Sequence, residues 1–314
     1  MNDKSYKTLT IGISSTALFD MRAETAIYQE HGFESYRQHQ FENRMNILPA
    51  GTAFYLVEKL LRINDPNEKP RVEVALISKN DIETGLRIRH SLDHYELDIP
   101  RIALTGGKAI EPSLLKAYGI DLFLSRNGTD VQNAVDADIA AAILHDPPKS
   151  PLKHGDKVHF SFDGDQVLFA GDSEDIFQKE GLLGFMRHEQ ENKNIPMPEG
   201  PFAKVLFVIE ALKATFDNDE CPIVTSLVTM RSAQSQMRPM NTLVEWGQIV
   251  DEAYMIGRGH ESGKKYQKVD VLDSIGADIF FDDQRCHTDL ASTVVPSGLV
   301  PTKTESKNTL KKVS

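Results

Sequence analysis

The chain has 314 residues, of which 40% are hydrophobic and 26% are charged, enough for one large core or two ordinary ones. Its 46 acidic and 35 basic residues give a formal net charge of −11, which argues against a sequence-independent grip on nucleic acid or an anionic membrane. With only two cysteines and no stretch typical of a leader or a membrane span, we expect a cytoplasmic protein without disulfides or a zinc site.

Strand and helix patterns alternate along both halves of the chain. Residues 9–14 and 158–163 are short apolar segments typical of strands. Each is followed by two helical stretches and then by strand, helix, strand, helix and strand. This order is typical of parallel sheets with crossover helices, so we expect an α/β fold in each half.

The two halves are also related by an internal repeat. At an offset of 149 residues, identical residue types pair without a gap: Ile27 with Ile176, Gln29 with Gln178, Gly32 with Gly181, His39 with His188, Glu42 with Glu191, Asn43 with Asn192, Pro49 with Pro198 and Gly51 with Gly200. Further on, residues 74–78 align with 225–229, and residues 119–125 align with 276–282. We infer two α/β units that arose by duplication.

This repeat predicts the domain organisation. The units are expected at residues 1–150 and 151–300, with a proline-rich junction at 146–151, because proline interrupts both helices and sheet ladders. Residues 301–314, rich in lysine, threonine and serine, are expected to form a disordered tail.

Two carboxylates, Asp163 and Asp165, stand just past the first strand of the second unit. Ligands of open α/β sheets bind at this end of the strands. A calcium loop is a poor fit, because Val167 and Leu168 stand where a ligand and a glycine are required. A plain Asp-Gly turn would account for Asp163 and Gly164 alone, so the choice depends on the other acids.

A second strand of the same unit ends in paired acids, Asp282 and Asp283. Adjacent carboxylates at the end of a buried strand repel one another unless a cation or a proton neutralises them. Between the two acidic sites, Thr229 ends another strand, and lysines precede the last helix. Acids, a hydroxyl and a lysine together indicate phosphoryl transfer.

These residues carry a resemblance to the haloacid dehalogenase (HAD) superfamily and, more narrowly, to the cytosolic 5'-nucleotidase type I family. The likeness runs from about residue 8 to residue 298. It rests on four segments: FDGDQVLF at 162–169, TMRSA at 229–233, FFDDQ at 280–284 and SSTALF at 14–19. It implies two duplicated HAD-like Rossmannoid units with parallel sheets and small helical caps, packed as an internal pseudo-dimer.

The resemblance also implies the chemistry. Asp163 would be the nucleophile that forms an aspartyl phosphate, and Asp165 would protonate the leaving nucleoside and later activate water. Thr229 would hydrogen-bond the phosphoryl group. Mg²⁺ would be held by carboxylates from the set Asp163, Asp165, Asp282 and Asp283.

Three further positions have less specific signals. The lysine that neutralises the phosphoryl charge is one of Lys264, Lys265 and Lys268, and we favour Lys268 because it opens the helix before Asp282. Lysines are usually exposed to solvent, so Lys264 and Lys265 can equally be read as ordinary surface residues. Arg231 and Ser232 are expected to bind phosphate or ribose, or else simply to begin a helix that Ser232 caps.

The repeat assigns no catalytic acid to the first unit. It pairs Asp163 with Ser14, Asp165 with Thr16, Thr229 with Ser78, Asp282 with Ser125 and Asp283 with Arg126. Hydroxyls and a cation cannot form a phosphoaspartate or hold magnesium. We expect a catalytically inactive unit, which is either a scaffold or the site of a nucleotide effector.

The sequence therefore predicts a magnesium-dependent 5'-nucleotidase. Its substrates would be nucleoside 5'-monophosphates such as AMP, with IMP and deoxynucleotides left open. Two alternatives remain: a phosphatase for another small phosphomonoester, and a nucleotide sensor without catalysis. Association into a homo-oligomer is also left open, whereas nucleic acid and membranes are not expected as partners.

Overall fold

The structure, a computed structural model, describes residues 7–149, 155–171, 173–217, 220–257 and 266–304. Strands and helices alternate through the first half. The strands are β1 (Leu9–Ile13), β2 (Val72–Ser78), β3 (Arg101–Leu104), β4 (Leu122–Ser125) and β5 (Ala140–Leu144). The helices are α1 (Ser15–Leu18), α2 (Arg22–Glu42), α3 (Phe54–Leu61), α4 (Ile82–His94), α5 (Pro112–Ala117) and α6 (Gly128–Asp136).

The second half repeats this order, except that α1 has no counterpart among the described helices. Its strands are β6 (Val158–Phe162), β7 (Ile223–Thr229), β8 (Glu252–Met255), β9 (Ile279–Asp282) and β10 (Ser297–Leu299). Its helices are α7 (Ser173–Glu191), α8 (Ala203–Lys213), α9 (Met237–Glu245), α10 (Lys268–Ile275) and α11 (Arg285–Ala291), with a 3₁₀ turn at Ala233–Ser235 before α9.

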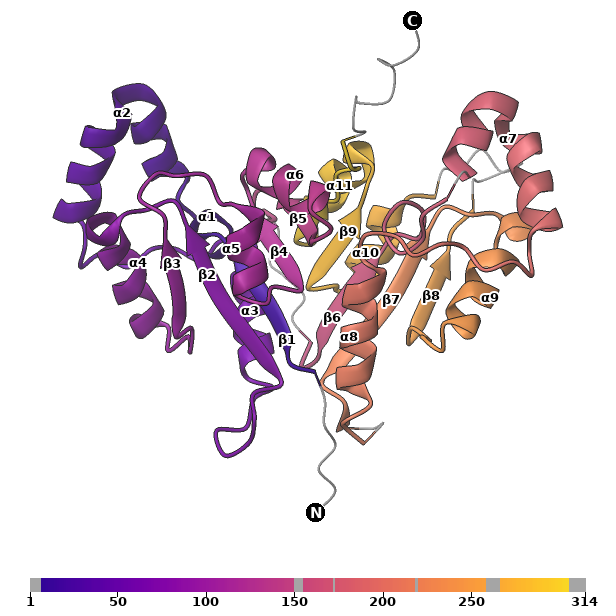
Figure 1. The fold of residues 1–314 in the computed structure, drawn as a ribbon, viewed down its shortest axis with the longest axis horizontal. Coiled ribbons are helices and arrows are strands. Elements are labelled where there is room, and N and C mark those ends of the chain that lie inside the picture. Colours follow the sequence, from indigo (N-terminus) through magenta and orange to yellow (C-terminus); the bar gives the residue numbers. More distant parts are fainter. Residues whose placement is uncertain (1–6, 150–154, 172, 218–219, 258–265, 305–314) are drawn as a thin grey trace, which may run out of the picture.

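The ten strands found in the described residues belong to one sheet, in the order β3-β2-β1-β4-β5-β10-β9-β6-β7-β8. The sheet spans the molecule from side to side in Figure 1, with the first half on one side and the second half on the other. Neighbouring strands are parallel within each half, and β5 pairs with β10 antiparallel at the junction. The expected α/β class with a mostly parallel sheet is confirmed.

The sequence patterns missed one strand in each half. They predicted four, whereas β5 and β10 add a fifth to each and form the junction. β5 reads Ala-Ala-Ala-Ile-Leu, a composition closer to a helix than to a strand, and β10 has only three residues. Both strands depend on their neighbours in the sheet, which no local pattern reveals. Residues 150 and 151 of the expected junction and residues 305–314 of the expected tail lie outside the described residues.

One apolar core runs through both halves. A single cluster of buried side chains includes Leu9 and Leu144 from the first half together with Phe160 and Phe281 from the second. Strands β1, β4 and β6 are buried at every position, as expected for strands that are covered on both faces. Within the described ranges, no helix is long and apolar enough to cross a bilayer.

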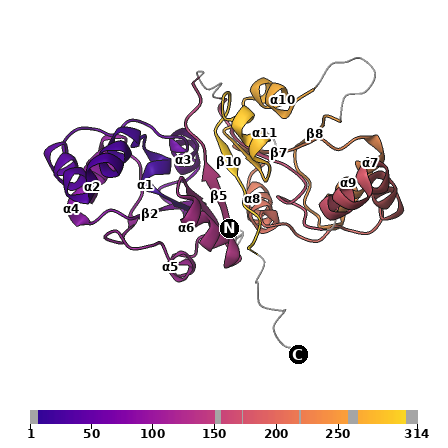
Figure 2. The ribbon, with the colours of Figure 1, turned by 90° about the horizontal axis from the view of Figure 1, so that it is seen from above.

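Helices α2 and α7 stand above the sheet, on the same side of the molecule in Figure 1. Seen from above, in Figure 2, they lie over opposite ends of it. Each is broken by a glycine of positive φ: Gly32 with φ 78° and ψ −177°, and Gly181 with φ 67° and ψ −168°. Side chains other than glycine rarely adopt this backbone conformation. The repeat therefore preserves a backbone requirement as well as a residue type.

Candidate active site at the carboxyl ends of the second-half strands

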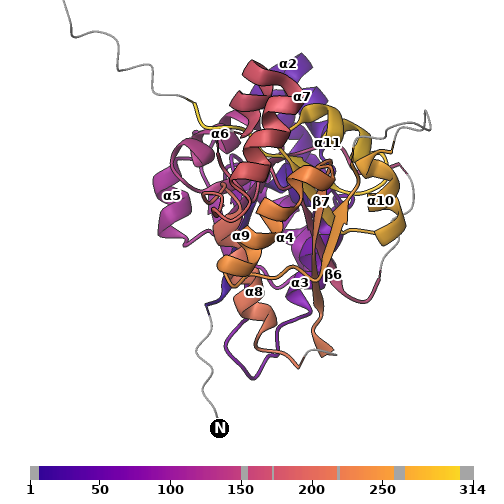
Figure 3. The ribbon, with the colours of Figure 1, turned by 90° about the vertical axis from the view of Figure 1, so that its right-hand side faces the viewer.

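Adjacent strands bring the predicted site residues to one edge of the sheet. Asp163 directly follows β6, Asp282 ends β9, and Thr229 ends β7. In the sheet, β6 lies between β9 and β7, so these carboxyl ends are neighbours. This is the edge at which parallel α/β sheets bind ligands. The side view in Figure 3 shows α7 above this half of the sheet.

Lys268 connects two of the predicted acids. Its Nζ lies 2.8 Å from Oδ1 of Asp163 and 2.6 Å from Oδ2 of Asp282. Asp163 is only 3% exposed, Lys268 4% and Asp282 0%, so the three charges are shielded from water. Lys264 and Lys265, the alternatives to Lys268, lie outside the described residues. Lys268 thus has the contact that neutralising a phosphoryl group on Asp163 requires.

Burial and neighbouring charges shift the pKa of each group. Burial raises the pKa of Asp163 to about 7, although the Lys268 ammonium opposes the rise. Burial also raises the pKa of Asp283, to about 8, and the carboxylates of Asp163 and Asp282 add to this effect. For Asp282, burial is outweighed by hydrogen bonds from His287 and Lys268, which hold its pKa below the ordinary value. The site carries more negative charge than one lysine can balance.

Three of the acids form a group suited to a metal ion. One carboxylate oxygen from each of Asp163, Asp282 and Asp283 lies within 4.8 Å of the others. Oδ1 of Asp283 is buried and has no hydrogen-bond partner among the described residues. A buried acceptor without a partner is costly, and hard oxygen ligands suit Mg²⁺. The donor set therefore fits a divalent cation.

Asp165 lies outside this group and is held by an arginine. Nε and Nη2 of Arg231 donate to the two carboxylate oxygens of Asp165 at 2.9 and 2.6 Å. Nη1 of the same guanidinium pairs with Glu189 of α7 and donates to the backbone carbonyl of Ser235 at 2.9 Å. The predicted contact of Arg231 with substrate thus requires it to leave a partner, and the roles of Asp165 and Arg231 stay predictions.

The remaining predicted residues are placed more simply. Thr229 is buried, and its Oγ1 accepts the backbone N–H of Arg231 at 3.3 Å. Ser232 precedes the 3₁₀ turn, and its carbonyl accepts the N–H of Ser235 at 2.9 Å, so its backbone begins that turn while its hydroxyl makes no capping bond. Its contact with phosphate or ribose stays a prediction.

Sequence reasoning missed several residues around the site. His287 places Nδ1 3.2 Å from Oδ2 of Asp282, and Arg238 donates to buried Glu189 at 3.0 Å. The repeat held a signal for the second pair: at the offsets already found, Arg238 aligns with Arg87 and Glu189 with Gln40. These two residues are also hydrogen-bonded, because Nη1 of Arg87 donates to Oε1 of Gln40 at 3.0 Å.

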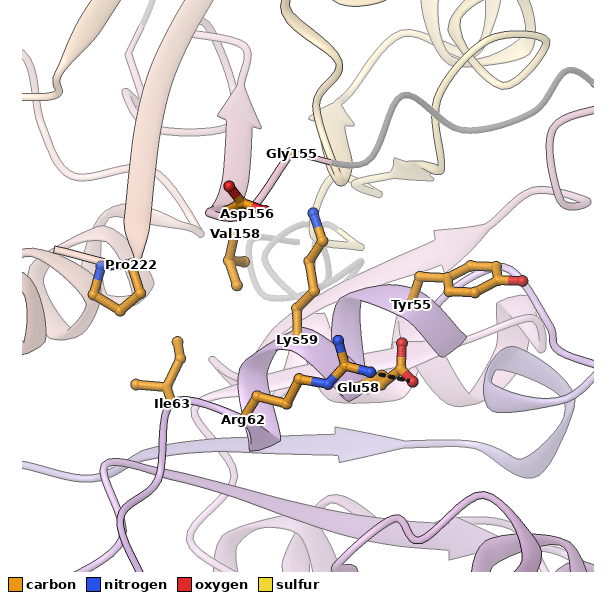
Figure 4. A pocket seen from close by; sticks show the side chains of 9 residues that line it. All are labelled: Tyr55, Glu58, Lys59, Arg62, Ile63, Gly155, Asp156, Val158 and Pro222. Carbon is orange, nitrogen blue, oxygen red and sulfur yellow. Dashed lines mark hydrogen bonds and ion pairs between the residues drawn. The ribbon is translucent and has the colours of Figure 1, made fainter. Parts of the chain in front are cut away.

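The opposite edge of the sheet has a separate cavity of about 440 Å³, between α3 and the beginnings of β6 and β7 (Figure 4). Lys59 reaches across it, but its Nζ lies 2.8 Å from Asp278 and so already has a buried partner. Arg62 is paired with Glu58. None of the acids predicted for catalysis lines this cavity, so it is separate from the candidate active site.

Comparisons with known proteins identify the family of the chain. The model of the 5'-nucleotidase family matches residues 1–307. The human protein named cytosolic 5'-nucleotidase 1B is 34% identical over 296 residues, which cover 90% of this chain and 47% of that protein. The chain therefore spans about half the length of this relative.

One solved structure, titled "Structure of the Pnkp1/Rnl/Hen1 RNA repair complex", covers 96% of this chain and 99% of its own at 11% identity. Its TM-score of 0.32 is too low for any argument. The family match and the identity to the human protein both support the resemblance found in the sequence motifs. The chain belongs to the 5'-nucleotidase family.

Proposed function

We propose that the second half of this chain hydrolyses nucleoside 5'-monophosphates to nucleoside and phosphate through an aspartyl phosphate on Asp163. The observation that carries the proposal is the contact of buried Asp163 with Lys268, beside Asp282 and Asp283. Family membership and the name of the human relative support the choice of substrate. The position of the site at the carboxyl ends of parallel strands is consistent with it.

In the first step, a carboxylate oxygen of Asp163 attacks phosphorus, and the bond between phosphorus and the nucleoside 5'-oxygen breaks. Asp165 gives its proton to that oxygen, which leaves as the nucleoside hydroxyl. Lys268, already in contact with Asp163, balances the charge of the phosphoryl oxygens, and the Thr229 hydroxyl donates to one of them. Nucleotide binding must first free an oxygen of Asp165 from Arg231, so that this carboxyl can carry a proton.

In the second step, Asp165 as carboxylate takes a proton from water, and the water oxygen attacks phosphorus. The bond between phosphorus and Asp163 breaks, which restores the Asp163 carboxylate and releases inorganic phosphate. Asp165 again carries a proton and is ready for the next nucleotide. The hydrogen bonds from Arg231 would direct this side chain between the two steps.

A magnesium ion fits the group formed by Asp163, Asp282 and Asp283. When bound, Mg²⁺ supplies positive charge against the phosphoryl oxygens. Asp282 is already oriented by Lys268, by His287 and by the N–H of Gln284 at 2.8 Å, whereas Oδ1 of Asp283 has no hydrogen-bond partner among the described residues. We propose Mg²⁺ as the ion because all the donors are carboxylate oxygens.

We further propose that the two halves are duplicated units of the HAD type, which form an internal pseudo-dimer with α2 and α7 as caps. The identical strand order of the halves and the matched kinks at Gly32 and Gly181 support this. Residues 1–150 would be the inactive unit and residues 151–300 the catalytic one. Within the described residues, the group suited to a metal occurs only in the second half. The first half would bind a nucleotide effector. Association of the chain into a homo-oligomer stays a prediction.

Phosphate release tests the function. AMP, IMP, CMP, UMP, their deoxy forms and glucose 6-phosphate are compared with Mg²⁺ and with EDTA. We expect magnesium-dependent release from nucleotides, reduced by about 10⁴-fold or more in Asp163→Asn protein. The matched control Asp93→Asn, at an exposed aspartate of α4, should retain full activity. Release from glucose 6-phosphate alone would refute the substrate, and full activity of Asp163→Asn would refute the nucleophile.

A further inference from the structure

The first half has a cavity of about 380 Å³ at the position that the active site occupies in the second half. Its volume is within the range of small-molecule sites. The carboxyl ends of β1, β2 and β4 line it with hydroxyls, α2 lines it with aromatic rings, and α6 lines it with one carboxylate, Asp130. The proposed reaction uses none of these residues.

Asp130 is the first sign that the cavity takes a ligand. The residue is 2% exposed, and its Oδ2 lies 2.9 Å from Nζ of Lys79. Its Oδ1 is buried and has no hydrogen-bond partner in the described part of the chain. Buried acceptors are nearly always paired, so Oδ1 calls for a donor such as a hydroxyl or an N–H of a ligand.

The charge of the cavity favours a neutral ligand over a phosphate. Lys79 is already neutralised by Asp130. The alignment that pairs Gly119 with Gly276 pairs Lys268 with Glu111, which is exposed, so the buried lysine of the active site has no counterpart. The same alignment pairs His287 with Asp130, which puts an anion where the active site has an imidazole.

The strand-end hydroxyls largely satisfy one another. Oγ of Ser15 lies 3.0 Å from Oγ of Ser78, and Oγ of Ser14 lies 3.3 Å from Oγ1 of Thr16. Asn80 donates to Ser78 at 3.0 Å and accepts from the hydroxyl of Tyr36 at 2.6 Å. This floor is polar and uncharged, which suits sugar hydroxyls better than a phosphate dianion.

Aromatic rings of α2 form the opposite wall. Tyr28 is 52% exposed and Phe33 is 41% exposed, although both line the cavity. Tyr28 meets Tyr36 edge to face, with ring centroids 6.0 Å apart. Aromatic faces that remain accessible can stack on a planar base. A ligand with a planar ring and attached hydroxyls would cover the side chains of Tyr28 and Phe33 and would also supply a donor to Asp130.

We propose that the first half binds a nucleoside, with its base against Tyr28 and Phe33 and a ribose hydroxyl donating to the carboxylate of Asp130. The choice of a nucleoside among hydroxylated aromatic ligands rests on the proposed function, since nucleoside is the product of that reaction. The site would register accumulated product at a place separate from the catalytic acids.

Calorimetric titration of the full chain with adenosine, guanosine, cytidine and uridine tests this proposal. Asp163→Asn protein without Mg²⁺ serves as the parent, so that turnover plays no part. We expect at least one nucleoside to bind, and Tyr28→Ala and Asp130→Asn each to weaken this binding by about five- to tenfold. Phe41→Ala is the matched control, because Phe41 is an exposed aromatic of the same helix outside the cavity.

Equal nucleoside binding in parent, Tyr28→Ala and Asp130→Asn proteins would overturn the proposal, as would no binding to the parent. Inorganic phosphate and AMP are titrated in parallel. Tighter binding of either one than of nucleoside, lost in a Lys79→Met variant, would show an anion site instead. Tyr28→Ala replaces an exposed side chain and should fold normally, so this variant still tests the proposal if Asp130→Asn protein does not fold. Failure here leaves phosphate release from AMP unaffected, which separates it from failure of the proposed function.

Discussion

At the scale of single residues, substitution of Lys268 tests whether this lysine acts in catalysis or only stabilises the fold. We expect Lys268→Met to lower kcat for AMP by about 10²- to 10³-fold, because one preorganised charge near the phosphoryl group is lost. Lys213→Met is the matched control, since Lys213 is another largely buried lysine, paired with Glu210 and Asp251 at 2.9 and 2.6 Å. Steady-state kinetics and thermal melting of both variants check this. A similar loss of kcat in both would make Lys268 a structural residue.

The raised pKa values of Asp163 and Asp283 predict how pH acts on the metal-free protein. Folded carboxyls with pKa values of about 7 and 8 bind more protons than unfolded ones, whose ordinary pKa is near 3.9. Their contribution to stability is therefore full below pH 4 and is lost as pH rises through 7 to 8. Bound Mg²⁺ would relieve the repulsion, so its stabilising effect should grow with pH.

Thermal melts in EDTA and in Mg²⁺ at pH 6 and pH 8.5 measure this effect. We expect the rise in Tm on adding Mg²⁺ to be several degrees larger at pH 8.5, and the difference to shrink in Asp283→Asn. The same rise at both pH values would contradict the account of repulsion between these carboxyls. Melts of Asp93→Asn protein control for the substitution itself.

Sequence reasoning located the strand-end residues but not their partners. Asp163, Thr229 and Asp282 could be placed because each follows an apolar strand, and parallel strands bring such ends together. Arg231 could not be assigned to Glu189, because that contact depends on the path of α7 above the sheet. The choice of Lys268 relied on spacing, and the structure adds the contacts with Asp163 and Asp282.

At the scale of elements, the broken helices α2 and α7 offer a matched pair of substitutions. Gly32 and Gly181 share a backbone conformation that strains other residues by about 1–3 kcal/mol, and a Cβ at either position would meet nothing within 4 Å. Alanine at either site should therefore lower stability by a similar amount. Only Gly181→Ala should also raise KM for AMP, by several-fold, because α7 is the helix that reaches Arg231 through Glu189.

Urea unfolding and Michaelis–Menten kinetics of the two alanine variants distinguish these effects. An equal change of KM in both variants would mean that the kinks act on the whole fold and that α7 has no special relation to the site. The sequence repeat matched Gly32 with Gly181, but it did not predict that the two helices are kinked at these glycines. A helical hydrophobic pattern does not show positive φ, and glycine is compatible with many backbone conformations.

At the scale of the whole molecule, the junction joins the two halves through a continuous sheet and a shared apolar core. The antiparallel pair β5 and β10 continues the sheet, and the apolar core passes through it. Lys59 of the first half also pairs with Asp278 of the second, where the two side chains are 11% and 4% exposed. Losing one partner of such a pair is costly, because a charge remains in a poorly hydrated place.

We therefore expect Lys59→Met to destabilise the entire chain by about 3 kcal/mol and to leave kcat unchanged, since Lys59 lies at the edge of the sheet opposite the active site. Fluorescence of Trp246, the one tryptophan of the chain, reports on the second half, whereas far-UV circular dichroism reports on both. Because one core spans the junction, the two signals should give a single urea transition that shifts as a unit in the variant. Two separate transitions in circular dichroism, with the fluorescence transition unshifted in the variant, would instead mean that the halves fold independently and that the shared sheet adds little cooperativity.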